Sequence, residues 1–339
     1  MNIPFPKESF TPINDIILQS VTAPAIIEAI KIKMFDVLEN QEKSLDDLAQ
    51  EFGFIPYKLE TVLNLLEVRG LVEKRDEKYS NSKIASEFLV STAPLYQGLA
   101  AIVSMGFCET VNSSLGEMLK KDKQERKDTD KKWSTEEAME GTAQNAVAGG
   151  LQKAVEIISE LPDFNSFKLM ADLGGNHGTY TMSILDKNPD LAGIICDLPK
   201  VADVAEKRCA QMGYAGRITG YGVDLRTGAL PDEKFDLILT SHFLYSCQDN
   251  LEPLFEKINQ ALLPGGWFVA HHHAHRGSDM SKETVVALEM MTRLCGYFSH
   301  FIEAEVLETK LAASGFGNFQ QKWTDHDNGL LLFAAQKEK

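Results

Sequence analysis

The sequence predicts an α/β protein in which a helical front half precedes a doubly wound parallel sheet. From residue 167 onward, short apolar runs of strand length alternate with helical stretches, as expected for a parallel sheet covered on both faces. Before residue 160, apolar residues recur mainly at helical spacing. The length of 339 residues also predicts about two domains.

Composition and charge narrow the class of protein. Hydrophobic residues make up 44% and charged residues 24%, which is typical of a soluble globular chain. There are 34 Lys and Arg against 49 Asp and Glu, and the net charge is -15. Such a surface repels phosphate backbones and anionic lipid, so we expect neither a nucleic-acid nor a membrane partner.

The cysteines indicate a reducing compartment. The five are far apart and form no CxxC pair, which disfavours a disulfide framework and a zinc ribbon. The first residues show no basic segment followed by an apolar run, so no signal peptide is visible. We therefore expect a cytoplasmic protein.

The first 90 residues contain a pattern of helix, turn, helix and hairpin. Ser44 is a plausible N-cap of a short helix that ends at Gly53. Pro56 begins a second helix, Gly70 closes it, and a hairpin is expected around residues 75–78. This order is typical of a winged helix-turn-helix.

Charge argues against DNA binding by this front domain. Residues 11–87 contain nine Lys and Arg but fourteen Asp and Glu, and the second helix carries one Lys and two Glu. A recognition helix needs cations for phosphates and polar groups for bases. We therefore expect a packing or dimerisation module at residues 1–90, followed by a helical linker at 91–160 and an α/β domain at 161–339.

A glycine-rich loop follows the first strand of the back half. The strand ends at Asp172, and Gly174, Gly175 and Gly178 lead into the next helix. Glycines allow the backbone to approach a ligand closely. A dinucleotide fingerprint would require glycines where Asn176 and Thr179 stand, so that template fails. An acidic residue here would repel pyrophosphate but suits a cationic ligand.

Two further acids occupy matching places at later strand ends. Asp197 follows the second strand, where a carboxylate suits a ribose diol. Asp224 follows the third strand and could accept a hydrogen bond from an adenine amino group, with Leu225 against the ring. One such acid is usually a surface or capping residue. Three beside a glycine loop, at the edge where α/β sheets bind ligands, indicate a site.

These motifs and the LLPGG turn resemble those of class I S-adenosylmethionine-dependent methyltransferases. With the front domain, residues 15–335 resemble the small-molecule O-methyltransferases typified by caffeic acid and hydroxyindole O-methyltransferases. The resemblance implies a Rossmann-like catalytic domain, S-adenosylmethionine as cofactor and a small-molecule acceptor. It also implies a homodimer whose front helices are exchanged, with residues 91–160 contributing to the acceptor pocket.

The resemblance also implies cofactor-binding residues, among which Asn176 replaces the usual glycine. Asn tolerates positive φ better than most residues, so this departure is mild. The methionine end, the ribose and the adenine would be held, in that order along the chain, by Asp172, Gly174, Gly178, Asp197, Leu198, Asp224 and Leu225, and Ser241 is an additional candidate.

The catalytic base of the family is missing from its usual place. Tyr245 stands where the family has a His, and His242 lies three residues earlier. The two supporting glutamates are also absent, with Phe301 near the first and apolar residues near the second. A hydroxyl acceptor needs proton removal, whereas a thioether sulfur or an electron-rich carbon does not before attack. O-methylation is the family default, and S- or C-methylation stays open.

A histidine cluster follows the last expected strand. His271, His273 and His275 alternate and could share one strand face, with His272 on the other. They could bind an acceptor, supply a replacement base, bind zinc, or only pack. We expect no metal. The catalytic candidates are Tyr245, His271 and His273, and the acceptor-binding candidates are Gln144, Asn145, His242, His275 and Met291.

Two alternatives from other classes are less favoured. A winged-helix transcription regulator that uses the pocket as a sensor conflicts with the acidic front domain. A nicotinamide oxidoreductase conflicts with the failed dinucleotide fingerprint.

Overall fold

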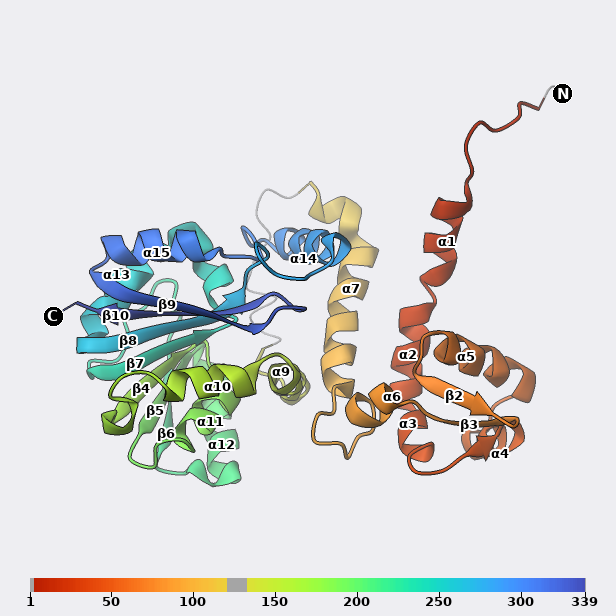
Figure 1. Cartoon of the computed structure of the whole chain (residues 1–339), viewed down its shortest axis with the longest axis horizontal. Coiled ribbons are helices and arrows are strands. Elements are labelled where there is room, and N and C mark those ends of the chain that lie inside the picture. The colour runs from red at the N-terminus through yellow and green to blue at the C-terminus, as the bar shows by residue number, and fades with distance from the viewer. Residues whose placement is uncertain (1–2, 121–132, 339) are drawn as a thin grey trace. The chain divides into compact units, whose positions relative to one another are not determined.

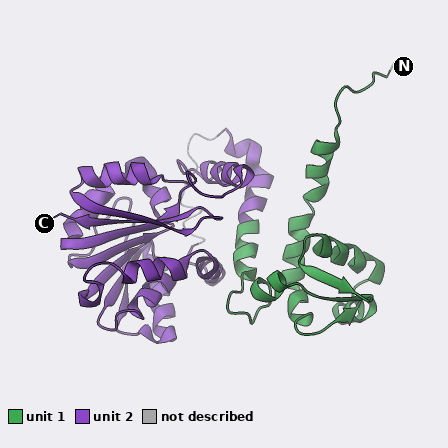
Figure 2. Cartoon of the chain, in the orientation of Figure 1, with its two compact units in different colours: residues 1–105 green, residues 106–339 purple. Residues whose placement is uncertain are grey.

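The computed structural model describes residues 3–120 and 133–338. The chain divides into two compact units, Met1–Met105 and Gly106–Lys339 (Figure 2). Each unit has its own hydrophobic core and is considered by itself.

The first unit combines helices with a small antiparallel sheet of order β1-β3-β2. Its helices are α1 (Thr11–Gln19), α2 (Thr22–Lys31), α3 (Met34–Val37), α4 (Leu45–Phe52), α5 (Pro56–Val68) and α6 (Lys83–Phe88). Its strands are β1 (Lys43–Ser44), β2 (Val72–Arg75) and β3 (Lys78–Asn81).

Local sequence signals account for the boundaries of these elements. The side chain of Ser44 accepts a hydrogen bond from the backbone of Asp47, and the reciprocal bond completes a capping box. Gly53 ends α4 in the left-handed conformation, and Pro56 opens α5. The predicted helix, helix and hairpin are therefore confirmed as elements.

One segment of this unit is unusually apolar and exposed. The run Thr11–Lys31 is long and apolar enough to cross a membrane, and only 17% of its most apolar 18-residue window is buried. Core helices of soluble proteins and signal sequences meet the same criterion of length and composition.

The second unit is built on a seven-stranded sheet of order β6-β5-β4-β7-β8-β10-β9, with helices on both faces (Figure 1). Its strands are β4 (Leu169–Leu173), β5 (Ala192–Asp197), β6 (Ile218–Gly222), β7 (Phe235–Ser241), β8 (Leu262–His273), β9 (Phe316–Asp325) and β10 (Leu330–Lys337). The five strands predicted from the sequence are β4 to β8, and they pair in parallel.

The helices divide between the two faces of the sheet. One face packs on α10 (Leu151–Ser159), α11 (Thr179–Leu185) and α12 (Pro199–Cys209). The other packs on α13 (Leu251–Ala261) and α15 (Ala304–Ala313). The remaining α-helices are α7 (Gly98–Met118), α9 (Glu136–Ala148) and α14 (Lys282–Leu294). Three short helical turns are η1 (Phe164–Ser166), η2 (Ala210–Tyr214) and η3 (Leu244–Asn250).

The sheet is parallel as expected from β4 to β8, and it is antiparallel at one edge. Strands β10 and β9 form a hairpin, and β10 pairs antiparallel with β8. After buried Phe316, the residues of β9 are half-buried or exposed, so the segment lacks the continuous apolar run that marks a buried strand. The hairpin brings the turn after Asp325 against the end of β8, where Leu330 pairs with His273.

Candidate functional site

A cavity of about 310 Å³ opens at the carboxyl ends of the parallel strands. The strand order places Asp224, Asp197 and Asp172 after or at the ends of β6, β5 and β4, on one side of the cavity. His242 and His273, at the ends of β7 and β8, lie on the other side. We call these the acidic half, defined by the three aspartates, and the imidazole half, defined by His242, His273 and His300.

Asp172 is the most deeply buried carboxyl of the acidic half. It is 1% exposed, and its Oδ2 accepts a hydrogen bond of 2.7 Å from Thr181 Oγ1. Burial raises the pKa of Asp172 to about 7, Thr181 opposes that rise, and Asp197 adds to it. Its Oδ1 has no hydrogen-bond partner among the described residues. A cationic ligand would lower this pKa and recover the cost of burying the carboxylate.

The glycine loop requires its glycines. Gly174 has φ of 75°, and a Cβ there would lie 2.6 Å from the ring of Phe243. Gly178 has φ of 71°, and a Cβ there would lie 2.4 Å from Cys209 Sγ. Gly178 does not line the cavity but begins α11. Asn176 adopts a φ of 39°, a positive value that Asn tolerates better than most residues.

The other two acids are held differently from each other. Asp197 accepts backbone hydrogen bonds from Asn176 at 3.1 Å and Leu198 at 2.7 Å. Asp224 forms a two-point ion pair with Arg226, with distances of 2.8 and 2.9 Å, and this contact lowers the pKa of Asp224. Arg226 therefore uses part of the accepting capacity of Asp224, and the carboxylate has further lone pairs that could accept the predicted hydrogen bond from an adenine amino group.

Three imidazoles converge on the imidazole half. The ring centroids of His242 and His273 are 5.1 Å apart, and those of His273 and His300 are 4.6 Å apart. Burial lowers the pKa of all three, and that of His300 falls to about 3. The three rings are therefore neutral at pH 7. His242 also has positive φ, 51°, which is uncommon for a residue with a side chain.

Tyr245 lies in η3 and lines the cavity beside these rings. Its ring meets Tyr297 edge-on at 5.1 Å and stacks on His300 at 5.9 Å. Because an ordinary tyrosine has a pKa near ~10, it is a poor base but can orient a polar acceptor.

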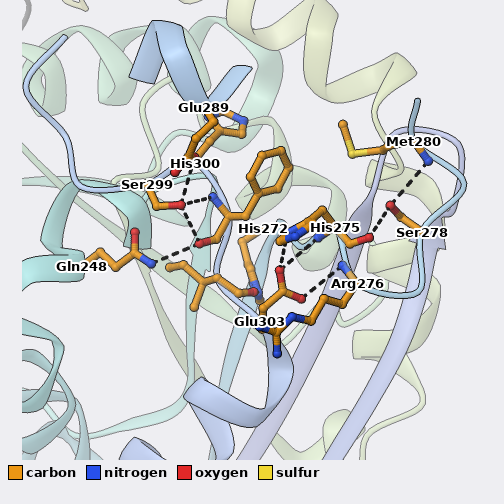
Figure 3. A network of polar contacts seen from close by, with 12 residues as sticks. Gln248, His272, His275, Arg276, Ser278, Met280, Glu289, Ser299, His300 and Glu303 are labelled. Carbon is orange, nitrogen blue, oxygen red and sulfur yellow. Dashed lines mark hydrogen bonds and ion pairs between the residues drawn. The ribbon is translucent and has the colours of Figure 1, made fainter. Parts of the chain in front are cut away.

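The segment that carries His300 is held by several elements (Figure 3). Glu289 of α14 accepts hydrogen bonds from the backbone nitrogen of His300 at 2.9 Å and from Ser299 Oγ at 3.0 Å. Gln248 donates to the carbonyl of Phe301 at 3.0 Å. This network fixes His300 against the cavity, and no sequence motif predicted it.

Two predicted histidines do not reach the cavity. His271 is completely buried, and its ring contacts Tyr180 at 2.9 Å and Thr324 at 2.7 Å through both nitrogens. His271 and His273 both pack against the ring of His242, as expected for residues on one strand face, but His271 does not line the cavity. His275 lies beyond the end of β8, where the strand alternation stops, and pairs with Glu303 at 2.6 Å (Figure 3).

Most of the remaining predicted residues line the cavity. They are Asn145, Gly174, Leu198, Leu225, Ser241 and Tyr245, whereas Gln144 and Met291 do not line it. Contributors that the sequence did not single out include Trp133, Thr142, Tyr180 and Tyr297, which come from helices or loops without a recognisable motif. No cluster of three or more His, Cys, Asp or Glu able to hold a metal occurs in residues 3–120 or 133–338.

Comparison with known protein families identifies the family to which the chain belongs. Residues 125–311 match the O-methyltransferase domain, and residues 15–91 match the O-methyltransferase dimerisation domain. The chain belongs to the O-methyltransferase family. It is accordingly an S-adenosylmethionine-dependent methyltransferase that acts on small molecules, which confirms the expected enzyme class and cofactor.

Individual relatives share low sequence identity with the chain, but the similarity covers most of each sequence. The chain is 25% identical over 275 residues to 3-hydroxy-5-methyl-1-naphthoate 3-O-methyltransferase of Streptomyces sahachiroi, covering 79% of this chain and 78% of that one. It is 24% identical over 243 residues to bacteriochlorophyllide d C-20 methyltransferase of Chlorobaculum tepidum, covering 70% and 71%. Human N-acetylserotonin methyltransferase, solved in complex with SAM, shares the fold with a TM-score of 0.77 at 17% identity, covering 99% and 100%.

Proposed function

We propose that this enzyme methylates a hydroxyl oxygen of a small, neutral acceptor held in the imidazole half. The observation that carries the proposal is the division of one cavity into an acidic half and a half lined by neutral imidazoles and aromatic rings. The one guanidinium among the described residues that line the cavity, Arg226, is paired with Asp224. An anionic acceptor would therefore lack a cationic partner in the imidazole half.

The acidic half fits S-adenosylmethionine. The unpaired Oδ1 of buried Asp172 suits the cationic methionine end, and the backbone around Gly174 leaves room for it. Asp197 with Leu198 would hold the ribose, and Asp224 with Leu225 the adenine. When bound, the cofactor supplies a methyl group on a positively charged sulfur.

On the acceptor side, we assign an orienting role to Tyr245 and contacts to Asn145 and His242. All three line the cavity. The naphthoate O-methyltransferase is a relative that supports an oxygen target. C-methylation is the second candidate, because two relatives are named as C-20 and tyrosine C(3) methyltransferases.

The family match to a dimerisation domain supports a homodimer. We further propose that residues 1–90 act as a winged-helix-like dimerisation domain, residues 91–160 as a linker to the acceptor pocket and residues 161–339 as the catalytic domain. The acidic composition supports a protein that works in the cytoplasm without nucleic acid or membrane partners.

Cofactor binding tests the assignment of the acidic half. Asp197→Ala should weaken binding of S-adenosylhomocysteine by about 100-fold or more, because it removes the carboxylate assigned to the ribose diol. Isothermal titration calorimetry at pH 7.5 measures this. Asp203→Ala, at an exposed position of α12, is the matched control and should bind like the parent. An Asp197→Ala affinity within twofold of the parent contradicts the assignment.

Product analysis tests the target atom. The enzyme is incubated with S-adenosylmethionine and naphthol, catechol, indole or a methylthio hydroxy acid, and products are identified by mass spectrometry and NMR. We expect methyl ethers from the hydroxylated aromatics. Methylation of indole carbon or of the thioether sulfur, with the hydroxyls untouched, would replace the oxygen assignment.

A further inference from the structure

We propose that His273 takes the proton from the acceptor hydroxyl and that the turn between β9 and β10 fixes the tautomer that allows it. The inference rests on the proposed O-methylation. The base would then lie at the end of β8. The family resemblance places it at the end of the neighbouring strand, β7. Tyr245 then orients the acceptor and does not accept its proton.

The hydrogen bond of the ring determines which nitrogen is available. Nδ1 of His273 lies 3.1 Å from the carbonyl oxygen of Asn328. A carbonyl oxygen only accepts, so the hydrogen of the neutral ring must sit on Nδ1. Nε2 is then a bare acceptor on a ring that lines the cavity. This is the tautomer that a proton-accepting imidazole needs.

The turn that supplies the carbonyl is itself fixed. Asp325 accepts from the backbone of Asn328 at 3.1 Å and from its side chain at 2.8 Å. Gly329, with φ of 63°, packs where a Cβ would lie 2.7 Å from the carbonyl oxygen of Ala274. Ala274 in turn donates to the carbonyl of Gly329 at 2.9 Å. These contacts fasten the turn to the residue that follows His273.

The other histidines in or near the cavity lack this combination. Both ring nitrogens of His271 contact hydroxyl groups, away from the cavity. Nε2 of His300 is a buried atom. No hydrogen bond from a described residue fixes a tautomer of His242, whose ring packs against His273. His272 also lines the cavity with a fixed tautomer, because its Nε2 lies 2.8 Å from the carbonyl oxygen of Ile302, but its Nδ1 is a buried atom. His273 joins a fixed tautomer to a place on the cavity wall, and its Nε2 is not among the buried atoms that lack a partner.

The proton step balances as follows. The acceptor oxygen forms a bond to the methyl carbon, the bond from that carbon to sulfur breaks, and its electron pair stays on sulfur. The hydroxyl proton passes to Nε2 of His273, and the resulting imidazolium keeps its hydrogen bond to Asn328. The hydroxyl becomes far more acidic as the methyl group arrives, so even a weak base can take the proton late in the reaction.

The surroundings of His273 determine its pH range. Burial is the main cause that lowers its pKa below 6.5, while the Asn328 carbonyl and Asp325 act in the opposite direction. The neighbouring rings of His242, His272 and His300 are neutral. His273 is therefore unprotonated at pH 7, and the single-turnover rate should stay flat from pH 8 to 6.5 and decline only below.

Nitrogen-15 NMR of the full chain with bound S-adenosylhomocysteine tests the tautomer without any acceptor. The His273 signals are assigned as those that vanish in His273→Gln. We expect hydrogen on Nδ1, no hydrogen on Nε2, and no titration above pH 6.5. Hydrogen on Nε2, or a midpoint above 6.5, overturns the inference. Asp325→Ala should shift the ring toward a mixture of tautomers, an effect that a purely structural role would not produce.

Kinetics with a hydroxylated aromatic from the product screen completes the test. His273→Gln should lower the single-turnover rate by about 100-fold or more while affinity for S-adenosylhomocysteine stays within twofold. Asp203→Ala, the exposed control used for cofactor binding, should keep the parent rate. A parent-like rate in His273→Gln refutes the base. A product methylated on carbon or sulfur refutes the proposed function instead, whatever the tautomer.

Discussion

At the residue scale, the buried carboxyl of Asp172 lowers the stability of the protein when no ligand is bound. Its carboxyl is buried at the end of β4 with one oxygen bonded to Thr181 and the other without a partner among described residues. Burial raises its pKa from 3.8 to about 7. An ionised group in this position destabilises the fold, and a cationic ligand removes that cost.

Because the pKa of Asp172 is raised in the folded protein, we predict how stability changes with pH. The folded-state pKa is raised, so the contribution of Asp172 to stability is fully present below about pH 4 and is lost as pH rises through about 7. Asp172→Asn cannot ionise, so without cofactor its advantage over the parent should grow from pH 5 to pH 8. We expect the advantage at pH 8 to reach roughly 2–4 kcal/mol in the free energy of unfolding.

Urea unfolding at pH 5 and pH 8 measures this difference. Asp203→Asn, at an exposed position, serves as control and should show no such pH-dependent change. An Asp172→Asn advantage that is equal at both pH values would show that the carboxyl ionises normally in the folded protein.

At the element scale, the β2–β3 hairpin carries a local strain that a substitution can relieve. Its two turn residues, Asp76 and Glu77, have φ of 44° and 61°. Two-residue hairpin loops favour this geometry, but glycine adopts it at lower cost. Glu77→Gly should therefore stabilise the protein by about 0.5–1 kcal/mol, although it removes an exposed ion pair with Lys74.

Chemical denaturation at pH 7 tests the hairpin prediction. Glu73→Gly, on β2 of the same hairpin, is the matched control and should destabilise, because glycine weakens a strand interior. A loss of stability in Glu77→Gly comparable to that in Glu73→Gly would show that the turn is not strained.

At the scale of the whole molecule, helix α1 carries apolar side chains that the other described residues do not cover. Ile13, Ile16, Ile17 and Leu18 of α1 are all more than half exposed. An apolar stripe of this kind usually marks an interface. The match to the dimerisation domain begins at residue 15, within α1, and supports a second copy of the chain as the partner.

We therefore expect Ile16→Lys combined with Ile17→Lys to shift the protein from dimer to monomer in sedimentation velocity. Buried apolar contact area would be exchanged for two charges, which should weaken self-association by at least about 100-fold. Asp15→Lys, on the same helix at a residue that is already polar, is the control. A double variant that stays dimeric, or a parent that floats with liposomes, would assign the stripe to another partner.

The sequence by itself determined the local elements and the acidic half of the cavity. Capping residues and turn residues act over a few positions, so Ser44, Gly53 and Pro56 marked the helix ends correctly. Asp172, Asp197 and Asp224 were found because parallel strands carry their carboxyl ends to one edge, a rule that needs no coordinates.

Only the tertiary structure decided the imidazole half. His300 reaches the cavity because Glu289 and Gln248 hold its segment, and neither contact leaves a periodic signal in the chain. Alternation along β8 could not separate His271 from His273, because what distinguishes them is burial against Tyr180 and Thr324 in one case and the Asn328 carbonyl in the other. Apart from the contact of Glu289 with His300, these contacts join residues more than 50 positions apart, and no local propensity encodes them.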